Sequence, residues 1–306
     1  MASTWTNLMG AEVKHGGGKY PGRYVEAGSG EPLLLLHGQG GHLENFSRNV
    51  MAYAQHFHVF ALDCVWHGYG PRPPFNPELV PAYMEQVLDF MDSQGIDAAN
   101  IEGQSMGGWT AQRLAFHHPD RVLKMVLTTA QGFVLHNDKG DTVGGLPGKE
   151  NLERQISFLK DPTKENIYQR MVGLLARAER LPQEPVDIRH KIYNDPATNA
   201  LLQQVVSNYM GGPGSPPQHH LMTATELSQI KAPTLVYWAE KNPVAPPAGE
   251  ILAAAIPGAQ HHLAMDTGHW AQFEHADEHN RVVLRFLTGN DSLEPLSVEG
   301  SEVAAG

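Results

Sequence analysis

The sequence predicts an α/β protein with a mostly parallel, doubly wound central sheet and a helical lid inserted between core strands. Two features of the 306 residues lead to this expectation. Short apolar runs bounded by turns alternate with amphipathic stretches at helical spacing, which is typical of a sheet covered by helices on both faces. The alternation stops after residue 132 and resumes near residue 228. We therefore expect core segments at 1–132 and 228–289, a helical lid at 133–227 and a disordered tail at 290–306.

The first core segment begins with a loose edge hairpin before residue 22 and a strand at 23–27. The run at 32–36, Pro-Leu-Leu-Leu-Leu, is apolar throughout. Such a run between turns predicts a strand buried on both faces, as in a parallel sheet. The other elements expected in order are a helix at 44–55, a strand at 58–62, a helix at 77–95, a strand ending at 100–102, a helix through 109–117 and a strand at 122–129.

The inserted segment carries only helical patterns, near 152–158, 164–181, 185–193 and 197–209. Breaks at Asp161-Pro162, at Pro182 and at the glycine-rich run 211–214 separate these patterns. Strand and helix then alternate again. We expect a strand at 233–238, a helix at 248–255, a strand at 260–265 and a helix at 274–287.

The composition favours a small-molecule substrate. The net charge is -11 and no basic run is present, which argues against nucleic acid or an anionic membrane as the main partner. A single cysteine, Cys64, excludes an intramolecular disulfide, and no run approaches the roughly 18 apolar residues of a membrane span. Residues 1–10 do not resemble a signal peptide. We expect a cytoplasmic protein without a cofactor and leave a homo-oligomer open.

Seventeen histidines raise the question of a metal site. They include three adjacent pairs, but neighbouring side chains on a helix or strand diverge. None of the pairs has the i, i+4 spacing with a nearby carboxylate that a helical zinc site uses. We therefore expect no metal. The pairs are His117-His118, His219-His220 and His261-His262.

The run at 103–107, Gly-Gln-Ser-Met-Gly, has the Gly-x-Ser-x-Gly spacing of a nucleophile elbow. A serine hydroxyl reacts only when a sharp turn lifts it beside a base and amide donors, and the two glycines leave room for that turn. An apolar strand precedes Ser105 and an amphipathic helix follows it, as the motif requires. The alternative is a glycine-rich turn whose serine only caps a helix.

A histidine and two amide donors complete the predicted site. His269 follows the last strand, so the sheet topology brings it to the same edge as Ser105, where it can act as the base. The backbone N–H of Met106 and an N–H from Gln39 or Gly38 can form an oxyanion hole. The glycine-rich turn at 38–41 has neither a Gly-x-Gly-x-x-Gly pattern nor a P-loop lysine, which argues against a phosphate site.

With these motifs in order, residues 20 to 288 resemble the α/β-hydrolase superfamily. The run at 268–278, Gly-His-Trp-Ala-Gln-Phe-Glu-His-Ala-Asp-Glu, is similar to the end of the meta-cleavage product hydrolases, which cleave a carbon–carbon bond in ring-fission products of aromatic catabolism. Two further stretches agree, the elbow itself and the lid run at 184–189.

The resemblance implies roles for four residues. Arg189 in the lid run would hold the substrate carboxylate, because its planar fork can bind a carboxylate through two hydrogen bonds. Trp270 would line the pocket, and Gln104 stands where the family usually has asparagine. The loop at 38–42, which includes Gly40 as a substrate-binding candidate, departs from the family's Gly-Gly-Gly-Pro-Gly. The alternative for Arg189 is a solvated position on the lid.

The resemblance also implies a reaction. A 2-hydroxy-6-oxo-hexa-2,4-dienoate would first be ketonised, with His269 a candidate proton shuttle. Attack on the C6 carbonyl and cleavage of the carbon–carbon bond would then release a carboxylic acid and a 2-hydroxypentadienoate.

The sequence lacks an obvious acid to support His269. The usual position, four residues beyond Trp238, is Asn242, while Glu240 lies two residues earlier and the stretch at 128–132 has no carboxylate. An asparagine can still accept the imidazole N–H through its side-chain oxygen. We expect a carbon–carbon bond hydrolase, with an ester or lactone hydrolase as the second reading. The alternative that is not an enzyme is a ligand-binding protein that has kept the fold and lost turnover.

Overall fold

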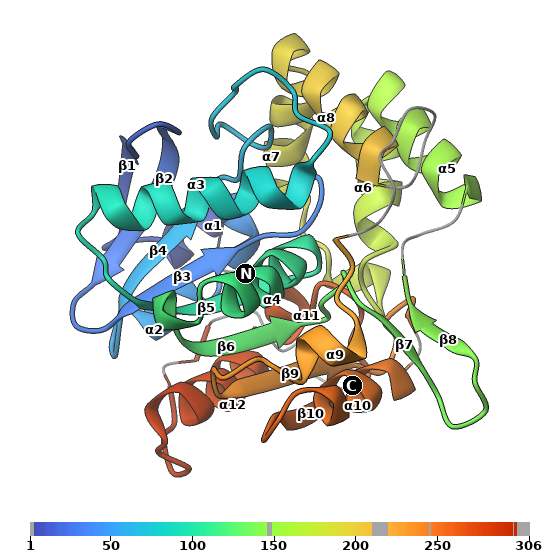
Figure 1. Ribbon diagram of the computed structural model, residues 1–306. Coiled ribbons are helices and arrows are strands. Elements are labelled where there is room, and N and C mark those ends of the chain that lie inside the picture. The colour runs from blue at the N-terminus through green and yellow to red at the C-terminus, as the bar shows by residue number, and fades with distance from the viewer. Residues whose placement is uncertain (1–2, 146–148, 210–219, 245, 296, 299–306) are drawn as a thin grey trace.

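The computed structural model describes residues 3–145, 149–209, 220–244, 246–295 and 297–298. Its centre is an eight-stranded sheet in the order β1-β2-β4-β3-β5-β6-β9-β10 (Figure 1). From β4 to β10 neighbouring strands run parallel. At the other edge β2 runs antiparallel to both of its neighbours, β1 and β4. The predicted doubly wound sheet is confirmed. Its strands are β1 (Glu12–Gly16), β2 (Gly22–Gly28), β3 (Pro32–Leu36), β4 (His58–Leu62), β5 (Ala99–Gln104), β6 (Val122–Thr128), β9 (Thr234–Ala239) and β10 (Gln260–Ala264).

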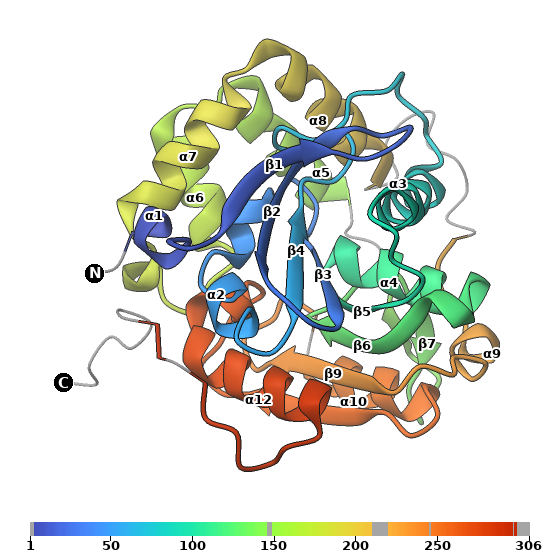
Figure 2. The same ribbon diagram turned by 90° about the vertical axis from the view of Figure 1, so that its left-hand side faces the viewer.

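Strand β3 shows why its sequence is apolar throughout. Leu34 and Leu36 pack into the core on one face of the sheet, and Leu33 and Leu35 pack into the core on the other. Alternate residues of a strand point to opposite faces, so both faces are covered. The first face carries α3 (Leu79–Ser93), α4 (Met106–His117) and α10 (Pro247–Ala255); the second carries α2 (Val50–Tyr53) and α12 (Ala276–Thr288) (Figure 2).

Four helices from the inserted segment lie beside the carboxyl ends of the strands (Figure 1). Their apolar faces form one core with Met106, Trp109 and Trp270, which belong to the elbow helix and the His269 loop. This packing places the inserted segment directly over the loops that carry the predicted site. The helices are α5 (Lys149–Lys160), α6 (Lys164–Val172), α7 (Gln183–Tyr193) and α8 (Pro196–Tyr209).

A small hairpin was not expected in the inserted segment. Strands β7 (Val134–His136) and β8 (Thr142–Gly144) pair antiparallel, so the expectation of helices only was wrong here. The turn is fixed by Asn137, whose side-chain oxygen accepts the backbone N–H groups of Lys139 and Asp141. The strands are too short and too polar to give a clear alternating pattern.

Two of the expected helices are shorter or broken in the structure. The helix expected at 164–181 ends at Val172, because Gly173 caps it and the backbone of the next residues binds the His269 loop instead. The helix expected at 44–55 is a 3₁₀ turn at Leu43–Phe46 followed by α2. The helix expected at 274–287 is α12, and α11 (Ala271–Glu274) is a separate short helix before it.

The remaining described elements are short helices at Thr4–Asn7 (α1) and Ala224–Leu227 (α9) and 3₁₀ turns at Pro119–Arg121 and Ala178–Arg180. In the described ranges, no helix is both long and apolar enough to span a bilayer. Leu293, in the tail that was expected to be disordered, packs on the core near α12. Residues 296 and 299–306 of that tail lie outside the described residues, as does the glycine-rich run at 211–214.

Candidate active site

Ser105 lies in a strained turn between β5 and α4. Its φ of 54° and ψ of -114° are dihedrals that residues with a side chain rarely adopt. Gly103 and Gly107 are required by packing, since a Cβ on Gly103 would lie 2.3 Å from the Gly107 oxygen and one on Gly107 would lie 2.1 Å from the Leu36 oxygen. The turn therefore has the geometry of a nucleophile elbow, and a simple helix cap does not explain its strain.

His269 lies on the loop after β10, and its ring contacts Asn242. The Asn242 Oδ1 atom is 2.8 Å from His269 Nδ1. Glu240 does not contact this ring; one of its oxygens accepts the Asp266 backbone N–H at 2.9 Å. Burial lowers the pKa of His269 to about 4, so the imidazole is neutral near pH 7 and can accept a proton.

The backbone of the His269 loop is held by its neighbours. The His269 carbonyl accepts hydrogen bonds from Thr129 Oγ1 at 2.7 Å and from Gln104 Nε2 at 3.1 Å. Gln104 therefore supports this loop, in addition to lining the cavity. The buried carboxylate of Glu274 accepts the Gly268 backbone N–H at 2.7 Å and the Ala176 backbone N–H at 2.9 Å, which fixes the loop to the inserted segment.

Two backbone N–H groups flank the serine. Met106 is the first residue of α4, so its N–H has no acceptor within the helix. On the other side, the loop at Gly38 and Gln39 approaches closely, because a Cβ on Gly38 would lie 2.9 Å from the Ser105 Cβ. An oxygen bound between Met106 and this loop could receive donors from both sides.

Arg189 reaches into the protein rather than into solvent. Its side chain is 2% exposed, and its Nη2 donates to Asn45 Oδ1 at 3.1 Å. The guanidinium lies 5.6 Å from the centroid of the Trp270 ring, which stacks in turn on Phe273. Burial lowers the pKa of Arg189 to about 10, and the group remains charged at neutral pH. The solvated alternative for this arginine is therefore wrong.

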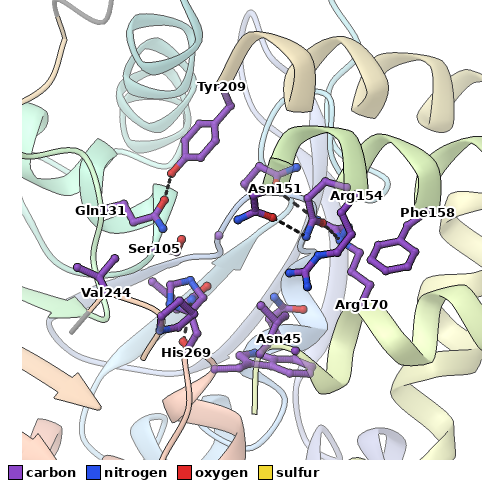
Figure 3. A pocket seen from close by; sticks show the side chains of 18 of the residues that line it. Asn45, Ser105, Gln131, Asn151, Arg154, Phe158, Arg170, Tyr209, Val244 and His269 are labelled. Atoms are coloured by element: carbon purple, nitrogen blue, oxygen red, sulfur yellow. Dashed lines mark hydrogen bonds between the residues drawn. The ribbon is translucent and has the colours of Figure 1, made fainter. Parts of the chain in front are cut away.

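A cavity of about 310 Å³ joins these groups. Ser105, His269 and Arg189 all line it, together with Trp270 and Gln104. Figure 3 shows Ser105 and His269 at one end and Asn45 and Arg170 at the other, with the inserted helices above. Predicted residues from the loop at Gly38 and Gln39, the elbow, α7 and the His269 loop thus meet in one place.

Gly40, a predicted substrate-binding residue, faces the inserted helices instead. A Cβ on Gly40 would lie 2.5 Å from Arg170 Nη2, and the Gly40 carbonyl accepts the Tyr193 hydroxyl at 2.8 Å. Its φ of 70° also favours glycine. Gly40 therefore allows close packing of this loop against α6 and α7, which corrects its placement in the cavity wall.

Several residues that line the cavity were not predicted, among them Asn45, Gln131, Arg170 and Tyr209. The Tyr209 hydroxyl donates to Gln131 Oε1 and also contacts the Ser105 side chain. Arg170 and Tyr209 lie on helices whose orientation only tertiary packing fixes. Across the described ranges, no group of three His, Cys, Asp or Glu side chains is placed to hold a metal ion.

The fold and this site define the class of protein: an α/β hydrolase with a serine, a histidine and a pair of amide donors at the carboxyl edge of the sheet. A family model described as alpha/beta hydrolase fold matches residues 31–276. Two curated relatives share one name, 2-hydroxy-6-oxononadienedioate/2-hydroxy-6-oxononatrienedioate hydrolase. The relative from Paraburkholderia phymatum is 30% identical over 94% of this chain and 99% of its own. The relative from Burkholderia vietnamiensis is 31% identical over 86% of this chain and 90% of its own.

Solved structures agree on the fold. The 2-hydroxy-6-oxo-6-phenylhexa-2,4-dienoate hydrolase from a Rhodococcus species superposes with a TM-score of 0.79 at 22% identity, over 91% of this chain and 99% of that one. A serine hydrolase from Cycloclasticus zankles also superposes with a TM-score of 0.79, at 24% identity, over 93% of this chain and 100% of that one. The chain therefore belongs to the α/β-hydrolase fold family and, within it, to the carbon–carbon bond hydrolases of the meta-cleavage type.

Proposed function

We propose that the substrate is a 2-hydroxy-6-oxo-hexa-2,4-dienoate-type ring-fission product and that Ser105 and His269 catalyse cleavage of its C5–C6 bond. The observation that carries this proposal is a buried arginine, Arg189, in the same cavity as Ser105 and His269. A buried cation is costly unless an anion pairs with it, and this substrate brings a carboxylate. The curated relatives act, by name, on dienedioates and trienedioates of this kind.

The proposed base works as a neutral imidazole. Asn242 Oδ1 accepts the His269 Nδ1–H, which leaves Nε2 unprotonated and able to take a proton. His269 would shuttle a proton during ketonisation and then accept the Ser105 proton as the hydroxyl attacks C6. Asn242 supplies no charge, so the imidazolium that forms is less stabilised than beside an aspartate. An activated vinylogous ketone tolerates this loss better than a simple ester.

The tetrahedral oxygen at C6 would bind the N–H groups of Met106 and of Gln39 or Gly38. Donors of this kind typically contribute several kcal/mol to the transition state. Arg189 would bind the C1 carboxylate, with Asn45 orienting the guanidinium and Trp270 forming the adjacent wall. The helices at 149–209 would act as a lid that excludes water from the cavity. Cleavage then gives a 2-hydroxypentadienoate and an ester of the acyl group with Ser105. Water that enters after the first product leaves, with His269 as its base, hydrolyses this ester to the carboxylic acid and regenerates Ser105.

Two measurements test this proposal against its alternatives. The first is a spectrophotometric screen of ring-fission products beside aryl esters and lactones; faster turnover of the esters or lactones would favour the second reading. The second is labelling with a serine-directed phosphonate, followed by mass spectrometry of the peptide that contains Ser105. An unlabelled Ser105 in folded protein would favour the ligand-binding reading, whereas a labelled one supports a hydrolase.

A further inference from the structure

Two guanidinium groups, not one, are buried at the cavity end opposite Ser105. Arg170 of α6 is 7% exposed and Arg189 of α7 is 2% exposed. In the described part of the chain, neither forms an ion pair with a carboxylate. Arg170 donates to Gln155 Oε1 at 2.6 Å, to Gln39 Oε1 at 3.3 Å and to the Tyr193 hydroxyl, which are all neutral acceptors. Two buried cations with only neutral partners are costly, and an anionic ligand would offset that cost.

The unsatisfied polar atoms at this end point to the same kind of ligand. Gln39 Nε2, Arg189 Nε and Trp270 Nε1 are buried and have no acceptor among the described residues. All three belong to side chains that line the cavity, and all three are donors. A ligand that fits here must therefore bring several acceptor oxygens.

The chemistry of the proposed reaction requires two such anionic groups side by side. When the C5–C6 bond of the ketonised substrate breaks, its electron pair moves through C3 and C4 to the oxygen on C2. The acyl group stays with the attacking oxygen, and the leaving fragment is a dienolate. It carries one negative charge on the C2 oxygen and a second on the adjacent C1 carboxylate. Protonation, with His269 returning the proton it accepted, completes 2-hydroxypentadienoate.

We propose that Arg170 is a second anion-binding residue of the active site, which binds with Arg189 the adjacent C1 carboxylate and C2 oxygen of the substrate. This inference rests on the proposed function for the identity of the substrate, but the anion site itself does not. Arg189 alone would leave one of the two charges without a cation. The competing reading is that Arg170 only ties α6 to Tyr193 and to the loop at Gln39.

Oxalate tests the site without turnover, because it carries two adjacent carboxylates, and acetate serves as the single-charge reference. Titration calorimetry should show that Arg170→Met weakens oxalate binding by at least about tenfold and acetate binding much less, as expected for loss of a charge-assisted pair. Arg170→Lys, which keeps the charge, should restore part of the oxalate affinity. Lys160→Met is the matched control, since Lys160 is an exposed cation on α5 that does not line this cavity, and it should leave both affinities unchanged.

Tyr193→Phe distinguishes the charge of Arg170 from its structural role. It removes the hydrogen bond between Arg170 and the Tyr193 hydroxyl and keeps both cations. It should retain the preference for oxalate over acetate. The inference is wrong if Tyr193→Phe loses as much oxalate affinity as Arg170→Met. It is also wrong if Arg170→Met weakens the binding of oxalate and of acetate equally. In either case Arg170 has only a structural role. If oxalate behaves as expected but no dienoate is cleaved, the anion site stands and the proposed function fails.

Discussion

The side-chain oxygen of Asn242 lies 2.8 Å from Nδ1 of His269, where a carboxylate would be expected in a serine triad. The amide can accept the ring N–H and hold the working tautomer, but it cannot balance the charge of the imidazolium. The structure also separates the two candidate residues, since Glu240 binds the Asp266 backbone and not the histidine. In this chain Asn242 can therefore orient His269 but cannot stabilise the positive charge of its imidazolium.

Asn242→Asp should therefore raise activity toward aryl esters by a larger factor than toward the vinylogous diketone. An ester needs more help to form its tetrahedral intermediate, and the new carboxylate stabilises the imidazolium that accompanies it. The measurement is kcat/KM for both substrates in the two proteins. Glu240→Gln is the matched control and should be nearly silent. Strong damage from Glu240→Gln would mean that Glu240, and not Asn242, supports the histidine in solution.

The pH dependence of kcat/KM should show a decline in acid only at low pH. Burial lowers the pKa of His269 to about 4, so the catalytic neutral form persists well below pH 6 and is lost only as the pH falls through that value. We expect kcat/KM to stay flat down to about pH 5. In Asn242→Asp the carboxylate favours the imidazolium, so this decline should move to higher pH. Activity recovered after return to pH 7 excludes acid unfolding; a decline that does not move in the variant would contradict the assignment.

Arg189→Gln should weaken binding of carboxylated substrates far more than that of neutral esters. Only the carboxylated substrates lose a charge-assisted pair, which typically contributes about 1.5–3 kcal/mol. The measurement is KM for a dienoate and for an aryl acetate, with Lys160→Gln as the control, since Lys160 is exposed and does not line the cavity. Equal losses for both substrates would show that Arg189 supports the cavity wall without binding a carboxylate.

Glu102 should make the protein less stable as the pH rises. Burial raises the pKa of Glu102 to about 8, above its ordinary value of 4.5, and its neighbours Thr128 and His279 lie 3.1 and 3.3 Å away. Between these two values the folded state holds a proton that the unfolded chain releases, so stability falls as the pH rises through the window.

Glu102→Gln removes this proton linkage. Its gain in Tm over wild type should be larger at pH 8 than at pH 5, by roughly 5 °C for a difference on the order of 2 kcal/mol. Glu12→Gln, at an exposed carboxylate on β1, should show no such pH-dependent gain. A gain that is equal at both pH values would mean that Glu102 is ionised in the folded protein across this range.

The sequence was informative where chemistry requires particular residues at a fixed spacing. The glycines around Ser105 and the loop position of His269 follow from local geometry, and Asn242 could be located by counting from Trp238. Arg170 could not be predicted, because an arginine on an amphipathic helix is ordinarily solvated and only the packing of α6 turns it inward. The turn at 137–140 did carry a hairpin signal in Asn137 and Gly140, but the flanking strands are too short to show a period.

The central claim is tested most directly by incubating the purified protein with 2-hydroxy-6-oxonona-2,4-dienedioate and identifying the products. The account predicts loss of the dienolate absorbance with equal amounts of succinate and 2-hydroxypenta-2,4-dienoate. Ser105→Ala should bind the substrate with near-normal affinity and release neither product, because the hydroxyl acts mainly in the chemical steps. A wild-type protein that hydrolyses aryl esters through Ser105 but leaves the dienedioate and related ring-fission products intact, or a Ser105→Ala variant with full turnover, would contradict it.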